Sequence, residues 1–217
     1  MGWKLHRGGR FRRWLGARLG GDAELGDRAW RRIMHLFGAA VLVYYPIPDD
    51  FFVVAPKVYV LLAALVAVLV IECLRHLFHL ELPTIRPYEA RRVGSYVFYS
   101  IALVGAVLLF PLPIAAAVVL GTALVDPIAG ELRSSAKFRS LYPGVPLAAY
   151  AALAFTGLDV IGRWPVTDSA GLAVLAACVG VASERPKLAW VDDDLAMTFL
   201  PALVLYGIGV LALGLPR

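Results

Sequence analysis

The chain alternates between long apolar stretches and short polar segments, and this alternation predicts seven membrane helices. The apolar stretches cover residues 33–47, 51–74, 93–110, 112–126, 143–161, 168–183 and 195–215. A helix needs about 20 residues to cross a bilayer, so the first and fourth stretches must be tilted, partly buried or extended by flanking residues. Pro111 and Pro113 predict a tight turn, because proline cannot continue a helix there. The expected fold is an all-α, polytopic membrane helical bundle of about seven transmembrane helices.

The composition agrees with a membrane protein. The 217 residues are 60% hydrophobic, with a mean hydropathy of +0.73, more than a soluble domain of this length needs. Residues 33–217 are expected to form one transmembrane domain. Residues 1–32 are rich in Arg with interleaved Trp and Leu, which predicts a basic amphipathic segment on the membrane surface. A nucleic-acid arm is the weaker interpretation of this segment, and Cys73 and Cys178 are expected to pack rather than form a disulfide.

The charges are distributed unequally between the two ends of the predicted helices. Residues 1–32, 75–92, 127–142 and 184–194 hold 18 of the 21 Lys and Arg residues, and the same end, with the helix ends next to these segments, receives all four His and 12 of the 16 acids. The positive-inside rule puts this end, including the N-terminus, in the cytoplasm and the C-terminus outside. A transporter would carry polar groups through the membrane midplane. The distribution instead suits an enzyme that takes a charged soluble substrate from the cytoplasm and a lipid from the bilayer.

The segment 119–144 contains the first candidate site. An apolar run stops at Asp126, and a carboxylate at the end of a membrane helix is costly without a partner or a function. Basic and small residues follow it: Gly130, Arg133, Ser134, Ser135, Lys137, Arg139, Ser140 and Gly144. An acid that can bind a divalent cation, next to basic and small residues that can bind phosphate, indicates a nucleotide site. The alternative is an ordinary cytoplasmic loop whose acid caps a helix.

Three other polar groups lie at the same predicted end. Asp192, Asp193 and Asp194 precede the last helix, where one Asp suffices as a cap, so the other two favour a metal ion or a basic partner. Arg32 and His35 share a helix face, although a snorkelling Arg and a packed His are the favoured interpretation of these two residues taken alone. Glu72, His76 and His79 have a spacing that suits a metal, but a salt-bridged helix end is the favoured interpretation.

The order of these motifs resembles the membrane-bound, CTP-dependent lipid-alcohol kinases, namely the dolichol, phytol and polyprenol kinases and the related CTP-dependent diacylglycerol kinases. The similar segments are residues 31–38 (R-R-x-x-H-x-x-G), 86–89 and 94–96 (R-x-x-E, then G-x-Y), 125–130, 139–144, 183–186 and 192–195. The chain departs from the family pattern at Val125, Arg139, Asp194 and Thr198.

The resemblance implies transfer of the γ-phosphate of CTP to the hydroxyl of an isoprenoid alcohol at the cytoplasmic face. It implies that Mg²⁺ is held by Asp126 and one or two of the three aspartates, with Asp192 and Asp193 first in line. The general base is left open between Asp193, His35 and Glu89. The residues expected to contact the nucleotide are Arg32, Gly130, Lys137, Arg139, Ser140, Gly144 and Glu184.

Several alternatives remain open at the level of sequence. A CTP-dependent diacylglycerol kinase and a CTP:phosphatidate cytidylyltransferase-like enzyme would use similar groups. A transporter and a non-catalytic scaffold are the alternatives outside enzymes. The expected partners are the nucleotide, the lipid alcohol and membrane lipids, with no nucleic acid, and a homodimer is one option for the oligomeric state.

Overall fold

The structure is a computed structural model that describes residues 32–49, 51, 55–80, 92–184 and 192–216. All regular elements within these residues are helices. They are the N-terminal helix Arg32–Tyr44, whose second half is the 3₁₀ segment η1 (Ala39–Tyr44); α3 (Lys57–Phe78); α4 (Ser95–Leu109); α5 (Leu112–Ser134); the short η3 (Arg139–Leu141); α6 (Gly144–Phe155) with its π-helical continuation η4 (Thr156–Ile161); α7 (Val166–Ser183); and α8 (Asp193–Leu205) with its π-helical continuation η5 (Tyr206–Ala212).

Each of the seven predicted stretches coincides with a helix, so the all-helical fold is confirmed for the described residues. Five helices are long and apolar enough to cross a membrane, while Arg32–Tyr44 and Ser95–Leu109 are shorter. The predicted surface segment 1–32 lies outside the described residues, apart from Arg32, which begins the first helix. Cys73 and Cys178 form no disulfide, as expected, but both are exposed rather than packed.

The fourth helix is extended by flanking residues, which is one of the possibilities predicted for its short apolar stretch. The apolar run stops at Asp126, yet α5 continues through Pro127 to Ser134. Most of residues 128–134 have good helix propensity, including Ala129, Glu131, Leu132 and Arg133. The added turns make this helix long enough to span a bilayer.

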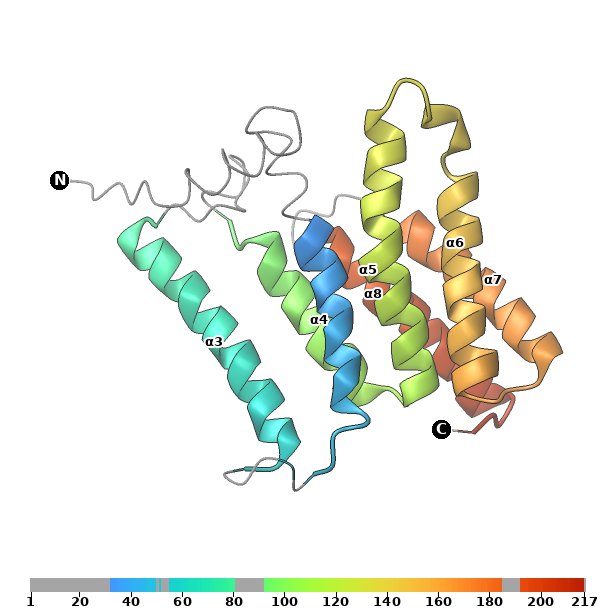
Figure 1. Ribbon diagram of the computed structural model, residues 1–217, viewed down its shortest axis with the longest axis horizontal. Helices are drawn as coiled ribbons and strands as arrows, with labels where there is room; N and C mark the ends of the chain where they lie inside the picture. Colours follow the sequence, from blue (N-terminus) through green and yellow to red (C-terminus); the bar gives the residue numbers. More distant parts are fainter. Residues whose placement is uncertain (1–31, 50, 52–54, 81–91, 185–191, 217) are drawn as a thin grey trace.

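Successive helices alternate in direction, so their ends gather in two groups (Figure 1). One group contains the ends at Arg32, Phe78, Ser95, Ser134, Gly144, Ser183 and Asp193, and we call it the polar end. At the opposite end Trp164 donates its indole N–H to the carbonyl of Pro216 at 2.9 Å. Because neighbouring helices run in opposite directions, every second helix begins at the polar end.

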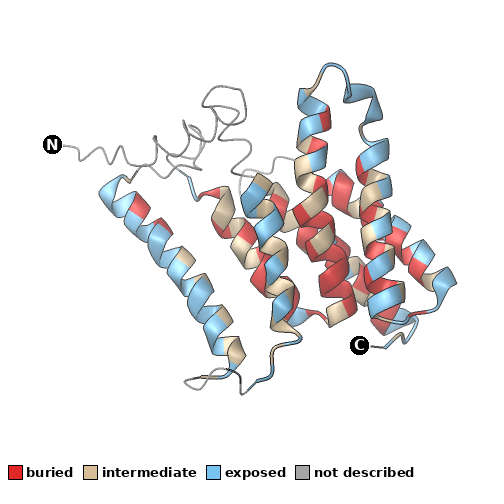
Figure 2. Ribbon diagram, in the orientation of Figure 1, coloured by how far each residue is buried: buried red, intermediate tan, exposed pale blue. Residues whose placement is uncertain are grey.

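Helix α5 is the centre of the bundle, and most of its apolar stretch is buried (Figure 2). Its run of small and β-branched residues at 115–119 has almost no exposed surface. Small residues allow close helix contact within a membrane. At Gly157 an added Cβ would lie 2.8 Å from the backbone nitrogen of Ala117, so only glycine permits this approach of η4 to α5.

Helix α3 stands apart from this bundle (Figure 1) and packs mainly against α4. Almost none of its apolar stretch is buried. The less exposed positions form a narrow stripe at Val58, Leu61, Leu65, Val68, Glu72 and Arg75. This spacing of three and four residues is that of a two-helix seam. The rest of the α3 surface is apolar and suited to contact with lipid.

Candidate functional site

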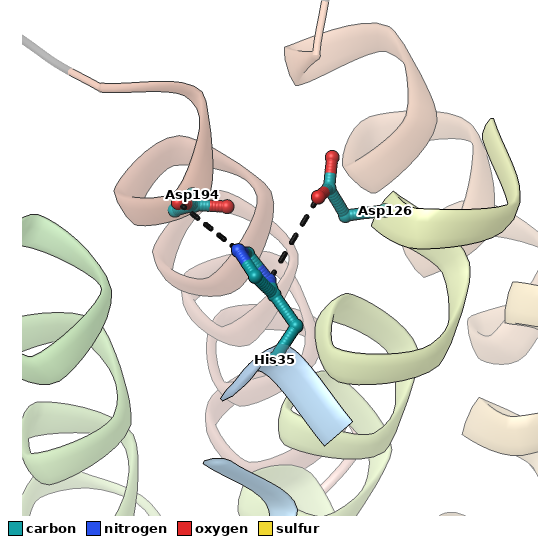
Figure 3. A group of neighbouring side chains, drawn as sticks. All are labelled: His35, Asp126 and Asp194. Atoms are coloured by element: carbon teal, nitrogen blue, oxygen red, sulfur yellow. Dashed lines mark ion pairs between the residues drawn. The ribbon is translucent and has the colours of Figure 1, made fainter. Parts of the chain in front are cut away.

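Three polar side chains from three separate helices meet at the polar end of the bundle. His35 comes from the N-terminal helix, Asp126 from α5 and Asp194 from α8 (Figure 3). His35 Nδ1 lies 3.8 Å from an Asp126 carboxylate oxygen, and His35 Nε2 lies 3.9 Å from one of Asp194. The imidazole is therefore placed between the two carboxylates, which are far apart in the sequence.

The His35 ring is held in this position by Tyr99 of α4. The two rings stack with centroids 4.4 Å apart, and the Tyr99 hydroxyl donates to the backbone carbonyl of His35 at 2.7 Å. Gly38 makes this possible, because a Cβ at that position would lie 2.6 Å from Tyr99 Cε1. His35 and Gly38 are three residues apart and share a helix face, so the structure gives a physical reason for the H-x-x-G spacing.

Asp126 lies inside α5, two turns before its end at Ser134. An N-cap residue has non-helical backbone geometry and precedes the first turn, so the interpretation of Asp126 as a helix cap is wrong. Its side chain is 24% exposed. The carboxylate is therefore part of the site rather than a helix terminus.

Asp194 is the member of the aspartate group that faces His35, and the sequence prediction had put Asp192 and Asp193 first. Asp192 is the N-cap of α8, where its side chain accepts from the backbone N–H of Asp194 at 3.2 Å. Asp194 begins the buried stripe of α8, which continues through Met197, Thr198, Pro201, Ala202 and Leu205. Asp194 follows this stripe in steps of three and four residues, so the rotation of α8 turns it, rather than Asp193, toward His35.

The backbone of Asp194 is also held by a buried polar contact one turn further along α8. The Thr198 hydroxyl donates to the Asp194 backbone carbonyl at 2.9 Å and lies 3.0 Å from the hydroxyl of Thr122 in α5. Both threonines are fully buried. This contact ties the start of α8 to the centre of the bundle one turn below the site.

One ligand atom from each of these three side chains lies close enough to the others to make the group a candidate cation site. Distances of 3.8 and 3.9 Å are too long for hydrogen bonds. Atoms that ligate one cation at about 2.0–2.2 Å stand roughly 3–4.4 Å from one another, and one ligand atom from each of His35, Asp126 and Asp194 lies within 4.8 Å of the others. Burial, and to a smaller extent the neighbouring Asp193, raise the pKa of Asp192 to about 6.

Two ion pairs surround this group. Arg32, predicted to contact a nucleotide, pairs with Glu131 of α5, and both side chains are partly exposed. Glu184, predicted for the same role, has no exposed side-chain surface and pairs with Arg133. The Tyr142 hydroxyl donates to Glu184 at 3.2 Å. A direct contact between Glu184 and a nucleotide is therefore not what this geometry favours.

Burial raises the pKa of the Glu184 carboxyl to about 7, even though Arg133 beside it lowers that pKa. The charges of Asp126 and Asp193 raise it further. The Glu184 carboxyl therefore interacts electrostatically with the carboxylates of the candidate site and its surroundings.

The remaining predicted residues occupy an exposed loop and its borders. Lys137, Arg139 and Ser140 lie between α5 and α6, and Gly144 begins α6. Neither cation forms an ion pair with the described part of the chain. A Cβ at Gly130 or Gly144 would meet nothing within 4 Å, so open space lies beside both glycines. Glu89 lies outside the described residues.

A second polar cluster, centred on Glu72, ties α3 to α4. Glu72 accepts from Arg75 in two hydrogen bonds of 2.7 Å, from the Gly94 N–H at 2.8 Å and from the Tyr96 hydroxyl at 2.7 Å. The expected salt-bridged helix end is confirmed. Sequence reasoning missed the cross-helix partners, because Gly94 and Tyr96 were interpreted only as part of a motif.

No family model matches the chain, and no curated protein or solved structure matches it.

Proposed function

We propose that this protein is an integral membrane lipid kinase that transfers the γ-phosphate of CTP to the hydroxyl of an isoprenoid alcohol. The observation that carries the proposal is the meeting of His35, Asp126 and Asp194 at one end of a bundle of apolar helices. These residues come from three of the segments that resemble the lipid-alcohol kinases. The proposed topology has seven membrane crossings, with the polar end in the cytoplasm.

The chemistry of the donor set supports a division of roles. Mg²⁺ prefers carboxylate oxygens over imidazole, so Asp126 and Asp194 would hold the ion and His35 would act on a proton. When bound, Mg²⁺ would neutralise phosphate charge and orient the nucleotide. His35 is our candidate base because Tyr99 fixes its ring between the two carboxylates.

The reaction that these residues would support is a direct displacement. The lipid hydroxyl oxygen forms a bond to the γ-phosphorus, the bond from that phosphorus to the bridging oxygen breaks, and CDP leaves. The hydroxyl proton passes to His35, and the charge that develops on the imidazole is stabilised by the two carboxylates.

The loop cations would meet the other part of the nucleotide. Ser134 lies two turns beyond Asp126, which is about 12 Å along the helix axis. Lys137 and Arg139 follow Ser134 in the loop, so they would contact a part of the triphosphate farther from the carboxylates. We propose that the triphosphate extends from the carboxylates toward Lys137 and Arg139.

The test uses purified protein in lipid nanodiscs with CTP labelled at either the α- or the γ-phosphate. The acceptors are a polyprenol, dolichol, phytol and diacylglycerol. Label transferred from the γ-position to an isoprenoid alcohol supports the proposal, and ATP in place of CTP tests the choice of nucleotide. Transfer of the α-label with release of pyrophosphate would instead identify a cytidylyltransferase. No transfer of either label to any acceptor would overturn the proposed kinase.

A further inference from the structure

Glu184 joins the two ends of the exposed loop between α5 and α6. Arg133, in the last turn of α5, pairs with one Glu184 carboxylate oxygen. Tyr142, just before α6, donates its hydroxyl to the other oxygen at 3.2 Å. One buried carboxylate therefore closes residues 133–142 into a ring.

The Arg133 guanidinium adds a second contact within this ring. It lies over the Tyr142 ring, 5.6 Å from the centroid, at a separation typical of a cation–π interaction. The two loop ends therefore contact each other as well as Glu184. The Glu184 side chain itself is fully buried, so its effect on the loop passes through these two residues.

The residues inside the ring have few other attachments. Lys137, Phe138 and Arg139 are exposed, and neither cation has an acidic partner in the described segments. A loop with few buried contacts opens locally at low free energy. Its position therefore depends on the contacts at its two ends.

We infer that Glu184 is a positioning residue: it fixes the loop ends and so sets where Lys137 and Arg139 meet the phosphates of the nucleotide. The inference rests on the proposed function, because that function supplies the triphosphate. Glu184 itself has no exposed side-chain surface from which to touch the ligand.

The variant Glu184→Gln tests this role while keeping the shape of the side chain. Arg133 is 40% exposed, so water can solvate its guanidinium once the partner charge is lost, and the protein is expected to fold. Tyr142→Phe removes one of the two attachments and is the milder variant. Glu131→Gln is the matched control, since it removes a carboxylate that pairs with Arg32 at the same end of α5 without joining the loop ends.

The first measurement is limited trypsin digestion of the full-length protein in nanodiscs, followed by mass spectrometry of cleavage after Lys137 and Arg139. Cleavage of a folded protein follows local opening. We expect Glu184→Gln to accelerate cleavage about tenfold and Tyr142→Phe about threefold, as expected for loss of a charge-assisted and a neutral hydrogen bond. Glu131→Gln should cleave at the wild-type rate. Unchanged cleavage in Glu184→Gln would overturn the inference, whether or not the protein is a kinase.

The second measurement is nucleotide dependence. In Glu184→Gln the KM for CTP should rise about tenfold while kcat stays within about threefold of wild type, and Mg²⁺–CTP should protect the wild-type loop from trypsin. A general loss of structure would instead lower kcat and solubility together, without a selective rise in KM. An unchanged KM together with faster cleavage would also overturn the role in nucleotide positioning. If wild-type protein neither binds CTP nor transfers phosphate, the proposed function fails, and the digestion still reports on the loop contact by itself.

Discussion

The sharpest test of the candidate site is the substitution Asp194→Asn. The side chain keeps its size and shape, but the charge 3.9 Å from His35 Nε2 is lost. Two unit charges at this distance interact by about 4 kcal/mol at an effective dielectric constant near 20. If Asp194 is ionised and His35 becomes positively charged in the transition state, this energy corresponds to roughly a thousandfold in rate. Little screening is expected, because the Asp194 side chain is only 7% exposed.

The assay is transfer of γ-phosphate from CTP to the lipid alcohol by purified protein in nanodiscs. We expect kcat to fall by about a hundredfold to a thousandfold. Folding should be preserved, because the substitution removes one charge from a crowded group of acids. Two controls accompany it: Asp168→Asn, in the first turn of α7 at the opposite end, should retain wild-type activity, and Asp193→Asn should lose less than Asp194→Asn. Full activity in Asp194→Asn, combined with loss in Asp193→Asn, would refute the geometric assignment.

Three further outcomes follow from the structure. Gly38→Ala should lower activity and the thermal midpoint, because the new Cβ overlaps the Tyr99 ring at a cost of about 1–3 kcal/mol; an unaltered midpoint would contradict that contact. The pKa of Glu184 is raised to about 7 in the folded protein, from its ordinary value near 4.5. Between these two pH values the Glu184 carboxyl is therefore protonated in the folded protein and ionised in the unfolded chain. In EDTA, the free energy of unfolding should therefore fall by on the order of 3 kcal/mol as the pH rises from about 4.5 to 7. In Glu184→Gln the melting temperature should no longer depend on pH in this way. With the native cysteines replaced, a cysteine at Arg163 should react with an impermeant maleimide from outside the cell and one at Ser135 should not; the reverse pattern would exclude the proposed topology.

Hydropathy alone predicted the helices because each one is a continuous apolar stretch, and lipid-facing and buried positions are both apolar. Hydropathy left the end of α5 open for the same reason, since residues 128–134 include charged residues but most of them still have good helix propensity. Hydropathy detects where the apolar run stops, which is not where the backbone hydrogen bonding stops. The prediction of a site near Asp126 depended on clustered charge, which the sequence displays directly.

The details of the site could not be predicted, because they depend on helix rotation and on contacts between distant segments. The choice of Asp194 over Asp193 is set by the phase of α8, which only its buried stripe reveals. The support of His35 by Tyr99 joins residues 64 apart in the chain, and no local pattern indicates it. Glu184 illustrates a third limit, since an acidic residue in a polar motif was expected to be accessible and is instead fully buried.

The isolation of α3 has a practical consequence for handling the protein. Its narrow apolar seam gains little from contact with α4 compared with contact with lipid, because bilayer hydrocarbon is as apolar as the seam. The polar cluster at Glu72 then holds one end of α3, and the surrounding bilayer confines the remainder. A short-chain detergent removes that confinement and leaves a helix anchored at one point, so we expect α3 to be the first element to separate during solubilisation. Native-lipid extraction, rather than delipidated micelles, is therefore the preparation in which the whole bundle should be studied.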